Sequence, residues 1–447
     1  MRHLTTLDLS YNCRLRAITN QTFLAFTNSS LQSLFLLHCH HVIELDACAF
    51  CPLEDLTNLH ISGTRSYVIN LNAALQSFYG FQNRNNLSVV MLADFSSNAV
   101  LGVSLDRHST QFMHNTCVKS LNLQSNFITS VTRGGLGRRG SIFNECIQNI
   151  DLSDNFIWCV DILAIYKVLA FSPRLESVHW ELQRVFSLEK ALYSFGNKKD
   201  DVAFFVAWVS TFQVAPTLSF VNISSSMKLF GSFPGSVVVK NADNLRTIDL
   251  SYNRIYGCTA TFKGFEHLQN LNLSGNDCRI ISDLFFDAFP KLKTLTLQRM
   301  NFDPLLFLTR GSRLFSSLAR LEILDLSHND LSRLPSDLLH AQTELRQLLL
   351  PGNRLDSFPL DIRHHGNLTL LDLSGNDIAQ LSVTERASLD VLVAKQPQPF
   401  HLRLHGNPLI CTCTTLTFVR WLRSTRIRLV RVSAGCFTYC TFMSSMC

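Results

Sequence analysis

"LTTLDLSYN" (Leu4 to Asn12) and "LEILDLSHN" (Leu321 to Asn329) share a nine-residue pattern, with leucine at the first, fourth and sixth positions and asparagine at the ninth. The pattern returns as "LRTIDLSYN" from Leu245, "LQNLNLSGN" from Leu268, "LRQLLLPGN" from Leu345 and "LTLLDLSGN" from Leu368. Self-similarity at a short period indicates a solenoid, in which each copy buries its apolar edge on its neighbours. The pattern therefore predicts a binding protein with a long open face and no enclosed catalytic pocket.

Looser copies fill the intervals, and a last partial copy, "HLRLHGN", ends at Asn407. The first positions of fourteen full copies are predicted at Leu4, Leu31, Leu56, Val90, Val118, Ile147, Leu175, Leu218, Leu245, Leu268, Leu292, Leu321, Leu345 and Leu368. The string resembles the leucine-rich repeat. This resemblance implies an α/β fold, a leucine-rich repeat solenoid (horseshoe) with a parallel sheet on its concave side.

Each residue type in a copy has an expected role. Leucines at alternating spacing should point inward from a short strand, because neighbours on a strand face opposite ways. The ninth residue should stand where the chain turns, so that its side chain satisfies backbone groups left unpaired there. We assign this turn role to Asn12, Cys39, Asn126, Asn155, Asn253, Asn276, Asn329, Asn353 and Asn376. Recurring phenylalanines are expected to pack between coils, namely Phe26, Phe50, Phe265, Phe289 and Phe315.

Composition favours an extracellular chain. Of the 447 residues, 17% are charged and 46% apolar, and the net charge of +6 does not indicate nucleic acid. Fourteen cysteines are many for a cytosolic protein and favour an oxidising compartment. Glycosylation sequons agree with secretion, at Asn20, Asn28, Asn86, Asn222, Asn272 and Asn367. We therefore expect the chain on the extracellular side of the cell surface.

Two cysteine pairs are expected to bridge. Cys48 and Cys51 stand close together in "CAFC" and could form a local disulfide. Cys117 and Cys146 stand just before the first position of adjacent copies. Equivalent points on neighbouring strands lie about 4.8 Å apart, within the roughly 4.4 to 6.8 Å Cα separation of a disulfide. We predict a bridge between these two residues.

After Asn407 the pattern changes to "NPLICTCTTLTFVRWL", which places Cys411 and Cys413 before an amphipathic stretch. This spacing resembles the cysteine-rich C-terminal flanking module of extracellular leucine-rich proteins. The resemblance implies a disulfide cap that pairs Cys411 with Cys436, and Cys413 with Cys440 or Cys447. We expect residues 1–398 to form the solenoid, about 14 repeats without an N-terminal cap, and residues 399–447 to form the last partial repeat and the cap.

The uneven repeat lengths, and the "LSxNxLxxLP" style of Leu326 to Pro335, make the chain similar to the ectodomain of a Toll-like receptor. That resemblance implies an innate immune receptor, part of a single-pass membrane protein, that binds microbial molecules on the solenoid surface and forms a homo- or heterodimer. No apolar run reaches the roughly 20 residues of a membrane helix. The longest, Val202 to Ala215, is expected to be a buried helix. An extracellular adhesion or matrix protein and a secreted decoy are the alternatives.

The interval from Leu175 to Leu218 is 43 residues, against 23 to 29 for most others, so ligand contacts are expected from Leu175 to Ser226. A missed degenerate repeat is the alternative explanation. "TRGGLGRRG" (Thr132 to Gly140) is interpreted as a solvated loop without a fixed conformation, with a protease-sensitive or anion-binding loop as the alternative.

The remaining candidate sites favour no catalytic, metal or cofactor chemistry. Five C-terminal arginines are interpreted as a solvated basic face, namely Arg420, Arg423, Arg426, Arg428 and Arg431. Nucleic acid or an anionic lipid headgroup is the alternative, although no aromatic residues are interleaved for base stacking. "HCHH" (His38 to His41) fits no standard zinc spacing. The chain shows no nucleophile–base motif, phosphate loop or H-E-x-x-H, so no enzyme activity is expected.

Overall fold

The computed structural model describes residues 3–12, 14–39, 42, 44–62, 71–77, 81, 87–93, 95, 103–132, 134–137, 139–157, 168, 170–183, 211–226, 235–253, 255, 257–303, 305–358, 360–396, 398–410 and 415–430. The chain divides into two compact units. Unit 1 comprises Met1–Leu229 and Val239–Leu245, and unit 2 comprises Phe230–Val238 and Arg246–Cys447.

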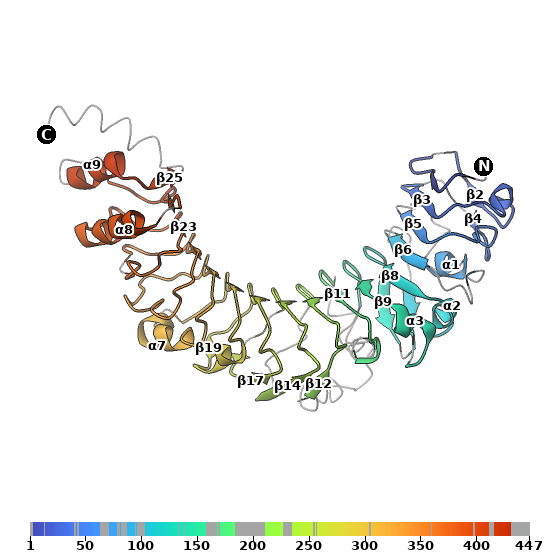
Figure 1. Ribbon diagram of the computed structural model, residues 1–447, viewed down its shortest axis with the longest axis horizontal. Coiled ribbons are helices and arrows are strands. Elements are labelled where there is room, and N and C mark those ends of the chain that lie inside the picture. The colour runs from blue at the N-terminus through green and yellow to red at the C-terminus, as the bar shows by residue number, and fades with distance from the viewer. Residues whose placement is uncertain are drawn as a thin grey trace, which may run out of the picture. The chain divides into compact units, whose positions relative to one another are not determined.

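The main sheet of each unit is built from short parallel strands, one for each copy of the repeat and a last one, β25, beyond the partial copy (Figure 1). In unit 1 their order is β1 (Thr6–Asp8), β3 (Ser33–Leu37), β5 (Asn58–Ser62), β6 (Leu87–Ala93), β8 (Val118–Asn122), β10 (Asn149–Asp151), β11 (Ser177–His179) and β13 (Phe220–Asn222). In unit 2 it is β15 (Thr247–Asp249), β18 (Asn270–Asn272), β20 (Thr294–Thr296), β21 (Ile323–Asp325), β22 (Gln347–Leu349), β23 (Leu370–Asp372), β24 (His401–Arg403) and β25 (Arg428–Val430). The predicted leucine-rich repeat solenoid is confirmed.

Smaller elements complete the coils, and Figure 1 shows them on the side of each coil away from the main strands. The short strand pairs are β2 (Ala17–Ile18) with β4 (Glu44–Leu45), β7 (Val103–Leu105) with β9 (Ile128–Val131), β14 (Ser236–Lys240) with β17 (Thr261–Lys263), and β16 (Gly257–Cys258) with β19 (Ile280–Ile281). The helices are η1 (Leu24–Phe26), α1 (Leu71–Gln76), α2 (Gln111–His114), α3 (Ile142–Cys146), η5 (Phe285–Ala288), α7 (Leu306–Leu314), α8 (Val383–Lys395) and α9 (Leu416–Ser424). Among the described residues, no helix combines the length and apolarity needed to cross a bilayer.

The predicted start of the fourth copy at Val90 is wrong. Val90 lies beside Leu59, which is the fourth residue of its own copy, and Leu87 lies beside the first-position residue Val118. The copy therefore begins at Leu87, three residues earlier, and Phe95 takes its ninth position. The run "LSVVML" offers two registers with aliphatic side chains at similar spacing, and only the pairing with both neighbours distinguishes them.

The long interval after Leu175 belongs to one coil. Strand β11 pairs directly with β13, with Val178 beside Val221, so no degenerate copy intervenes in the main sheet. Residues 184–210, which hold most of the extra length, are outside the described residues. Residues 211–213 form β12 (Thr211–Gln213), where a helix is predicted. The backbone N–H of Val214 donates to the Lys240 carbonyl at 3.1 Å, so inter-strand bonding replaces local helical bonding there.

Phenylalanine rings pack from coil to coil in both units. Phe50 is fully buried, and its ring centroid lies 5.9 Å from that of Phe23. Phe23 rather than the predicted Phe26 therefore makes this contact, and Phe26 is only half-buried. In unit 2 the ring centroids of Phe265 and Phe289 are 5.7 Å apart.

Every described eighth position of the repeat has a left-handed backbone. These residues are Tyr11, His38, Ser125, Asp154, Leu182, Ser225, Tyr252, Gly275, Arg299, His328, Gly352, Gly375 and Gly406, with φ between 49° and 74°. Glycine adopts this conformation without a steric penalty, whereas other residues lose roughly 1–2 kcal/mol. The position therefore stores backbone strain wherever its residue is not glycine, asparagine or aspartate.

Leu182 has a left-handed backbone, with φ of 58°, and its side chain is 56% exposed. Replacing Leu182 with asparagine, which tolerates the left-handed region, should raise the free energy of unfolding by up to about 1 kcal/mol. Leu182→Val should lower it, because a β-branched residue is a poor fit there. Urea unfolding midpoints of the two variants test this. Equal midpoints would show that the strain is relieved elsewhere in the coil.

Candidate ligand-binding face

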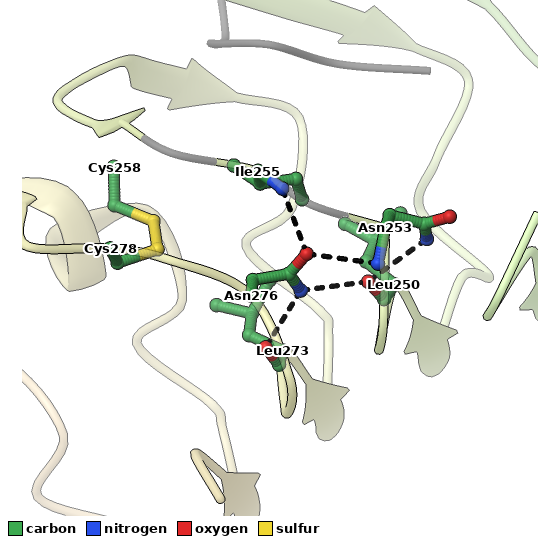
Figure 2. Close-up of a disulfide and its surroundings, with 7 residues drawn as sticks. All are labelled: Leu250, Asn253, Ile255, Cys258, Leu273, Asn276 and Cys278. Carbon is green, nitrogen blue, oxygen red and sulfur yellow. Dashed lines mark hydrogen bonds between the residues drawn. A yellow bond between two sulfur atoms is a disulfide. The ribbon is translucent and has the colours of Figure 1, made fainter. Parts of the chain in front are cut away.

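Ninth-position amides connect successive coils. Asn276 is a buried example, and Figure 2 shows its bonds. Its Oδ1 accepts from the backbone N–H groups of Asn253 and Ile255, each at 3.0 Å. Its Nδ2 donates to the carbonyls of Leu250 at 2.9 Å and Leu273 at 2.7 Å. Equivalent amide bonds between coils are made by Asn126, Asn155, Asn329, Asn353, Asn376 and Asn407.

Other residue types take the ninth position in the weaker copies. The side chain of Gln183 accepts from Ile157 N–H at 3.0 Å and donates to the Leu152 carbonyl at 2.8 Å. Glutamine has one more methylene than asparagine, but its amide makes the same kind of bonds between coils here. The sequence pattern allowed only asparagine or cysteine at the ninth position, so it did not predict this role. The buried thiol of Cys39 lies 3.5 Å from the Leu9 carbonyl. Asn12 is exposed, and its Oδ1 accepts from Arg14 N–H at 3.2 Å.

The structure contains three disulfides among the described residues. Cys48 bridges Cys51, and Cys117 bridges Cys146 with a Cα separation of 5.3 Å. The third, between Cys258 and Cys278, was not expected from sequence (Figure 2). These two cysteines follow the ninth positions of adjacent copies by five and two residues, so the repeat register was the available signal. The cap cysteines Cys411, Cys413, Cys436, Cys440 and Cys447 lie outside the described residues, and their pairing stays a prediction.

The sequons differ in accessibility. Asn20, Asn28 and Asn367 are exposed, and Asn86 lies outside the described residues. Asn222 and Asn272 are half-buried on the strands β13 and β18. The Nδ2 atom of Asn272, where a glycan would be attached, donates to Asp249 Oδ2 at 2.9 Å. A glycan there would replace this contact, and glycosylation stays a prediction at all six sites.

Much of the solvent-facing side of the main sheet is held by local polar contacts. In each Asp-x-Ser copy the aspartate accepts from the serine N–H two residues later, as Asp325 does from Ser327 at 2.9 Å. In later copies the second oxygen accepts from a donor on an adjacent coil, as Asp325 does from Gln298 on the preceding coil and Asp372 does from Arg403 on the following coil. The polar groups of these side chains are therefore already hydrogen-bonded within the sheet, and few of them are available to bind a ligand.

On the first coils of unit 1, the solvent-facing side of the main sheet has aromatic and apolar side chains. Half-buried Phe35, on β3, stacks on half-buried His60, on β5, with ring centroids 4.7 Å apart. His60 Nδ1 lies 3.5 Å from Met91 Sδ on β6, and burial lowers the pKa of His60. The ring of Tyr11, 70% exposed, lies 5.0 Å from that of His38. Phe35, His60 and Met91 are paired across the adjacent strands β3, β5 and β6, and we call these three residues the aromatic face.

A charged pair lies farther along unit 1, inside the predicted contact region. His179 Nδ1 is 3.6 Å from Glu181 Oε1, and the His179 ring centroid is 4.8 Å from that of Phe220. The hydrogen bond to Glu181 raises the pKa of His179, although partial burial opposes it. Burial is the largest single influence on Glu181 and would raise its pKa, but the contacts with His179 and with the backbone N–H groups of Glu181 and Trp180 together lower that pKa.

The pair predicts a pH dependence. A histidine whose pKa is raised on folding stabilises the folded chain fully below its unfolded pKa of about 6.5. That contribution is lost as the pH rises through the raised folded pKa. An NMR titration should place the His179 midpoint above that of the free side chain, and Glu181→Gln should lower it. An unchanged midpoint in Glu181→Gln would mean that Glu181 is not the cause.

The glycine-rich stretch is packed at its centre, although Thr132, Arg139 and Gly140 at its two ends are exposed. Leu136 is 3% exposed, and Gly135 packs so tightly that a Cβ atom there would lie 2.0 Å from the Leu105 carbonyl oxygen. The guanidinium of Arg139 lies 5.6 Å from the centre of the Phe171 ring. The interpretation as a loop without fixed conformation is therefore wrong around Gly135 and Gly137, because these two glycines permit close packing. Arg133 and Arg138 lie outside the described residues.

Among the described residues, no group of three or more His, Cys, Asp and Glu side chains could hold a metal ion. In the "HCHH" stretch, His38 packs on Tyr11 and Cys39 stands at the coil turn. His40 and His41 lie outside the described residues.

Comparisons with known proteins agree with this geometry. Leucine-rich repeat family models match residues 243–302 and 320–341. Two structures share the fold at low identity. Toll in the Drosophila Toll–Spätzle complex has a TM-score of 0.54 at 19% identity, covering 96% of this chain and 55% of that chain. A leucine-rich repeat protein of Leptospira interrogans has a TM-score of 0.58 at 18% identity, covering 96% of each chain. The fold of the chain is that of a leucine-rich repeat solenoid.

Within that class, the sequence is similar to Toll-like receptors and to the CD180 antigen. It is 31% identical over 189 residues to the CD180 antigen of Mus musculus, covering 41% of this chain and 27% of the relative. It is 30% identical over 186 residues to a Toll-like receptor 4 of Pinctada imbricata, covering 42% of this chain and 20% of the relative. Fibromodulin of Bos taurus is 29% identical over 163 residues, 35% of this chain and 41% of the relative. The matches thus span less than half of each relative.

Proposed function

We propose that this chain is the extracellular ligand-recognition region of a Toll-like innate immune receptor, which binds a microbial molecule on its sheet face and dimerises. The likeness to Toll-like receptors and the CD180 antigen supports the receptor class. The disulfides support an oxidising, extracellular location. The Toll structure, which is a complex with Spätzle, supports a protein or ligand partner for this solenoid.

The aromatic face carries the proposal. On most other coils the sheet side chains satisfy one another, whereas Phe35, His60 and Met91 present half-buried apolar surface to solvent. Aromatic side chains with a polar edge are enriched where proteins bind partners, because they bury large apolar area at low entropic cost. We place the ligand on this face, and keep the region from Leu175 to Ser226 as the second candidate.

Binding of labelled lipopolysaccharide, lipopeptide, flagellin and single-stranded RNA to the purified chain tests the proposal. At least one probe should bind, and Phe35→Ser with His60→Ser should weaken it by roughly tenfold or more. The matched control is Thr294→Ser with Thr296→Ser, on the face of β20, which should leave binding unchanged. If no probe binds, or if both double variants bind equally, the aromatic face is not the ligand site. Sedimentation with and without the bound probe tests dimerisation.

An extracellular adhesion or matrix protein is the second candidate, favoured by the match to fibromodulin. It predicts that none of the four microbial probes binds and that the chain self-associates or binds matrix proteins without them. A secreted decoy shares the ligand but not the signalling partner, so it predicts the same probe binding as the receptor.

A further inference from the structure

The net positive charge of this chain is concentrated at its C-terminal end. Residues 391–447 contain seven of the 40 Lys and Arg residues and none of the 34 Asp and Glu residues. The remaining 390 residues therefore have 33 basic and 34 acidic side chains and are almost neutral. Such asymmetry between parts of one chain indicates an interaction with a polyanion, provided that the charges are accessible together.

Helix α9 presents two of these charges on one face. Its apolar side is buried, with Phe418 fully buried and Trp421 at 8% exposure. Arg420 and Arg423 are exposed, and residues three apart on a helix are neighbours, about 5–6 Å between Cβ atoms. The helix packs through its aromatic residues and directs both guanidinium groups to solvent.

The segment that follows α9 contributes two more exposed arginines. Arg426 and Arg428 are exposed and flank Ile427, which is 5% exposed. The chain bends at Arg426 and Ile427 before β25 begins, and it buries the isoleucine while both arginines remain exposed. Arg428 begins β25, which pairs with β24 and is the last strand of the main sheet. Together these residues form a C-terminal arginine cluster (Arg420, Arg423, Arg426 and Arg428).

No carboxylate neutralises the cluster within the part of the chain that the structure describes. Asp390, the last acidic residue of the sequence, accepts from Trp421 Nε1 with both carboxylate oxygens at 2.9 Å. The neighbouring Asp372 is paired with Arg403 at 3.0 Å. Four exposed arginines therefore lie between residues 420 and 428 of unit 2, and the last carboxylate that precedes them in the sequence is already engaged by Trp421.

We propose that the C-terminal arginine cluster binds a sulfated polysaccharide. Arginine offers a planar fork of donors that fits the oxygens of an anionic group, and several such groups along one polymer could engage the cluster at once. The aromatic residues of α9 are buried, so the cluster lacks a stacking surface for nucleic-acid bases. Anionic lipids concentrate on the cytoplasmic leaflet, away from an extracellular chain. The choice of polyanion rests on the extracellular location proposed above.

Heparin, as a sulfated polysaccharide, is the probe for this inference. Wild-type chain should bind it with an affinity that falls steeply as salt increases, because binding releases counterions. Replacing all four arginines of the cluster with glutamine should weaken binding by roughly tenfold or more at physiological salt. The matched control replaces four exposed arginines elsewhere, namely Arg174, Arg313, Arg320 and Arg333, with glutamine. It removes the same charge and should retain most of the heparin affinity.

Circular dichroism and the melting temperature should show that both quadruple glutamine variants are folded. A variant with lysine in place of the four arginines of the cluster should bind heparin more tightly than the glutamine variant, although less tightly than wild type. Absent heparin binding, or equal losses in both glutamine variants, would overturn the proposal. It would also be overturned if duplex DNA or phosphatidylserine vesicles bound the cluster more tightly than heparin at the same salt. The microbial probes are read out separately on the aromatic face, so failure here would leave the proposed receptor function standing.

Discussion

Asn276→Ala should lower the free energy of unfolding by about 3 kcal/mol, because two N–H groups and the Leu273 carbonyl lose this amide at once, while the Leu250 carbonyl retains the bond from Asn253 Nδ2. Two N–H groups and two carbonyls of adjacent coils converge on this amide at 2.7–3.0 Å. The residue is 1% exposed, so water cannot readily replace the amide. The largest effect should fall on the coils of Leu250 and Leu273, whose carbonyls would be left without this donor.

Asn270→Ala is the matched control in the same coil. Its amide makes one bond, to Thr247 Oγ1 at 3.0 Å, on the half-exposed sheet face, and the loss should be below about 1 kcal/mol. Urea unfolding of the full chain and hydrogen exchange of the amides from 245 to 300 measure both variants. Similar losses in the two would show that the coil turn does not depend on the ninth-position amide.

Gly135→Ala should destabilise unit 1 by about 3 kcal/mol, the upper part of the range for overpacking. A Cβ atom there would lie 2.0 Å from the carbonyl oxygen and 2.6 Å from the carbonyl carbon of Leu105. Both obstructing atoms are backbone atoms of β7, so a change of rotamer cannot relieve the clash. The expected local result is separation of β7 from the glycine-rich stretch.

Gly366→Ala is the control, since a Cβ atom at that position meets nothing within 4 Å and its backbone is not left-handed. It should leave the melting temperature unchanged or raise it slightly. A melting temperature of Gly135→Ala equal to that of Gly366→Ala would contradict the packing argument. Faster hydrogen exchange in residues 103–105 of Gly135→Ala would support it.

Several features of the fold could be predicted from the leucine spacing. In the strong copies, such as the one from Leu268, three aliphatic positions and an asparagine agree on one register, and the strand β18 lies where that register places it. The copy from Leu87 shows why weaker strings fail. Its aliphatic residues are continuous from Val89 to Leu92, so two registers satisfy the alternation, and the partner strands decide between them.

The candidate site was less accessible to sequence reasoning. Phe35, His60 and Met91 are separated by 25 and 31 residues and occupy the variable fifth position of their copies. Nothing in their local sequence marks them as neighbours, because their proximity comes from the stacking of coils. The same holds for Cys258 and Cys278, which meet through two coils whose turns have different lengths.

Repetition is a local property of a chain, and it was enough here to predict the solenoid, its inward leucines, its coil turns and the class of protein. Side-chain contacts across coils are not local, and the structure was needed to show the aromatic face, the packed glycines, the amide role of Gln183 and the grouping of four arginines. The physical reason is that strand pairing every coil brings together residues some 20 to 45 positions apart, and small changes in turn length decide which ones meet.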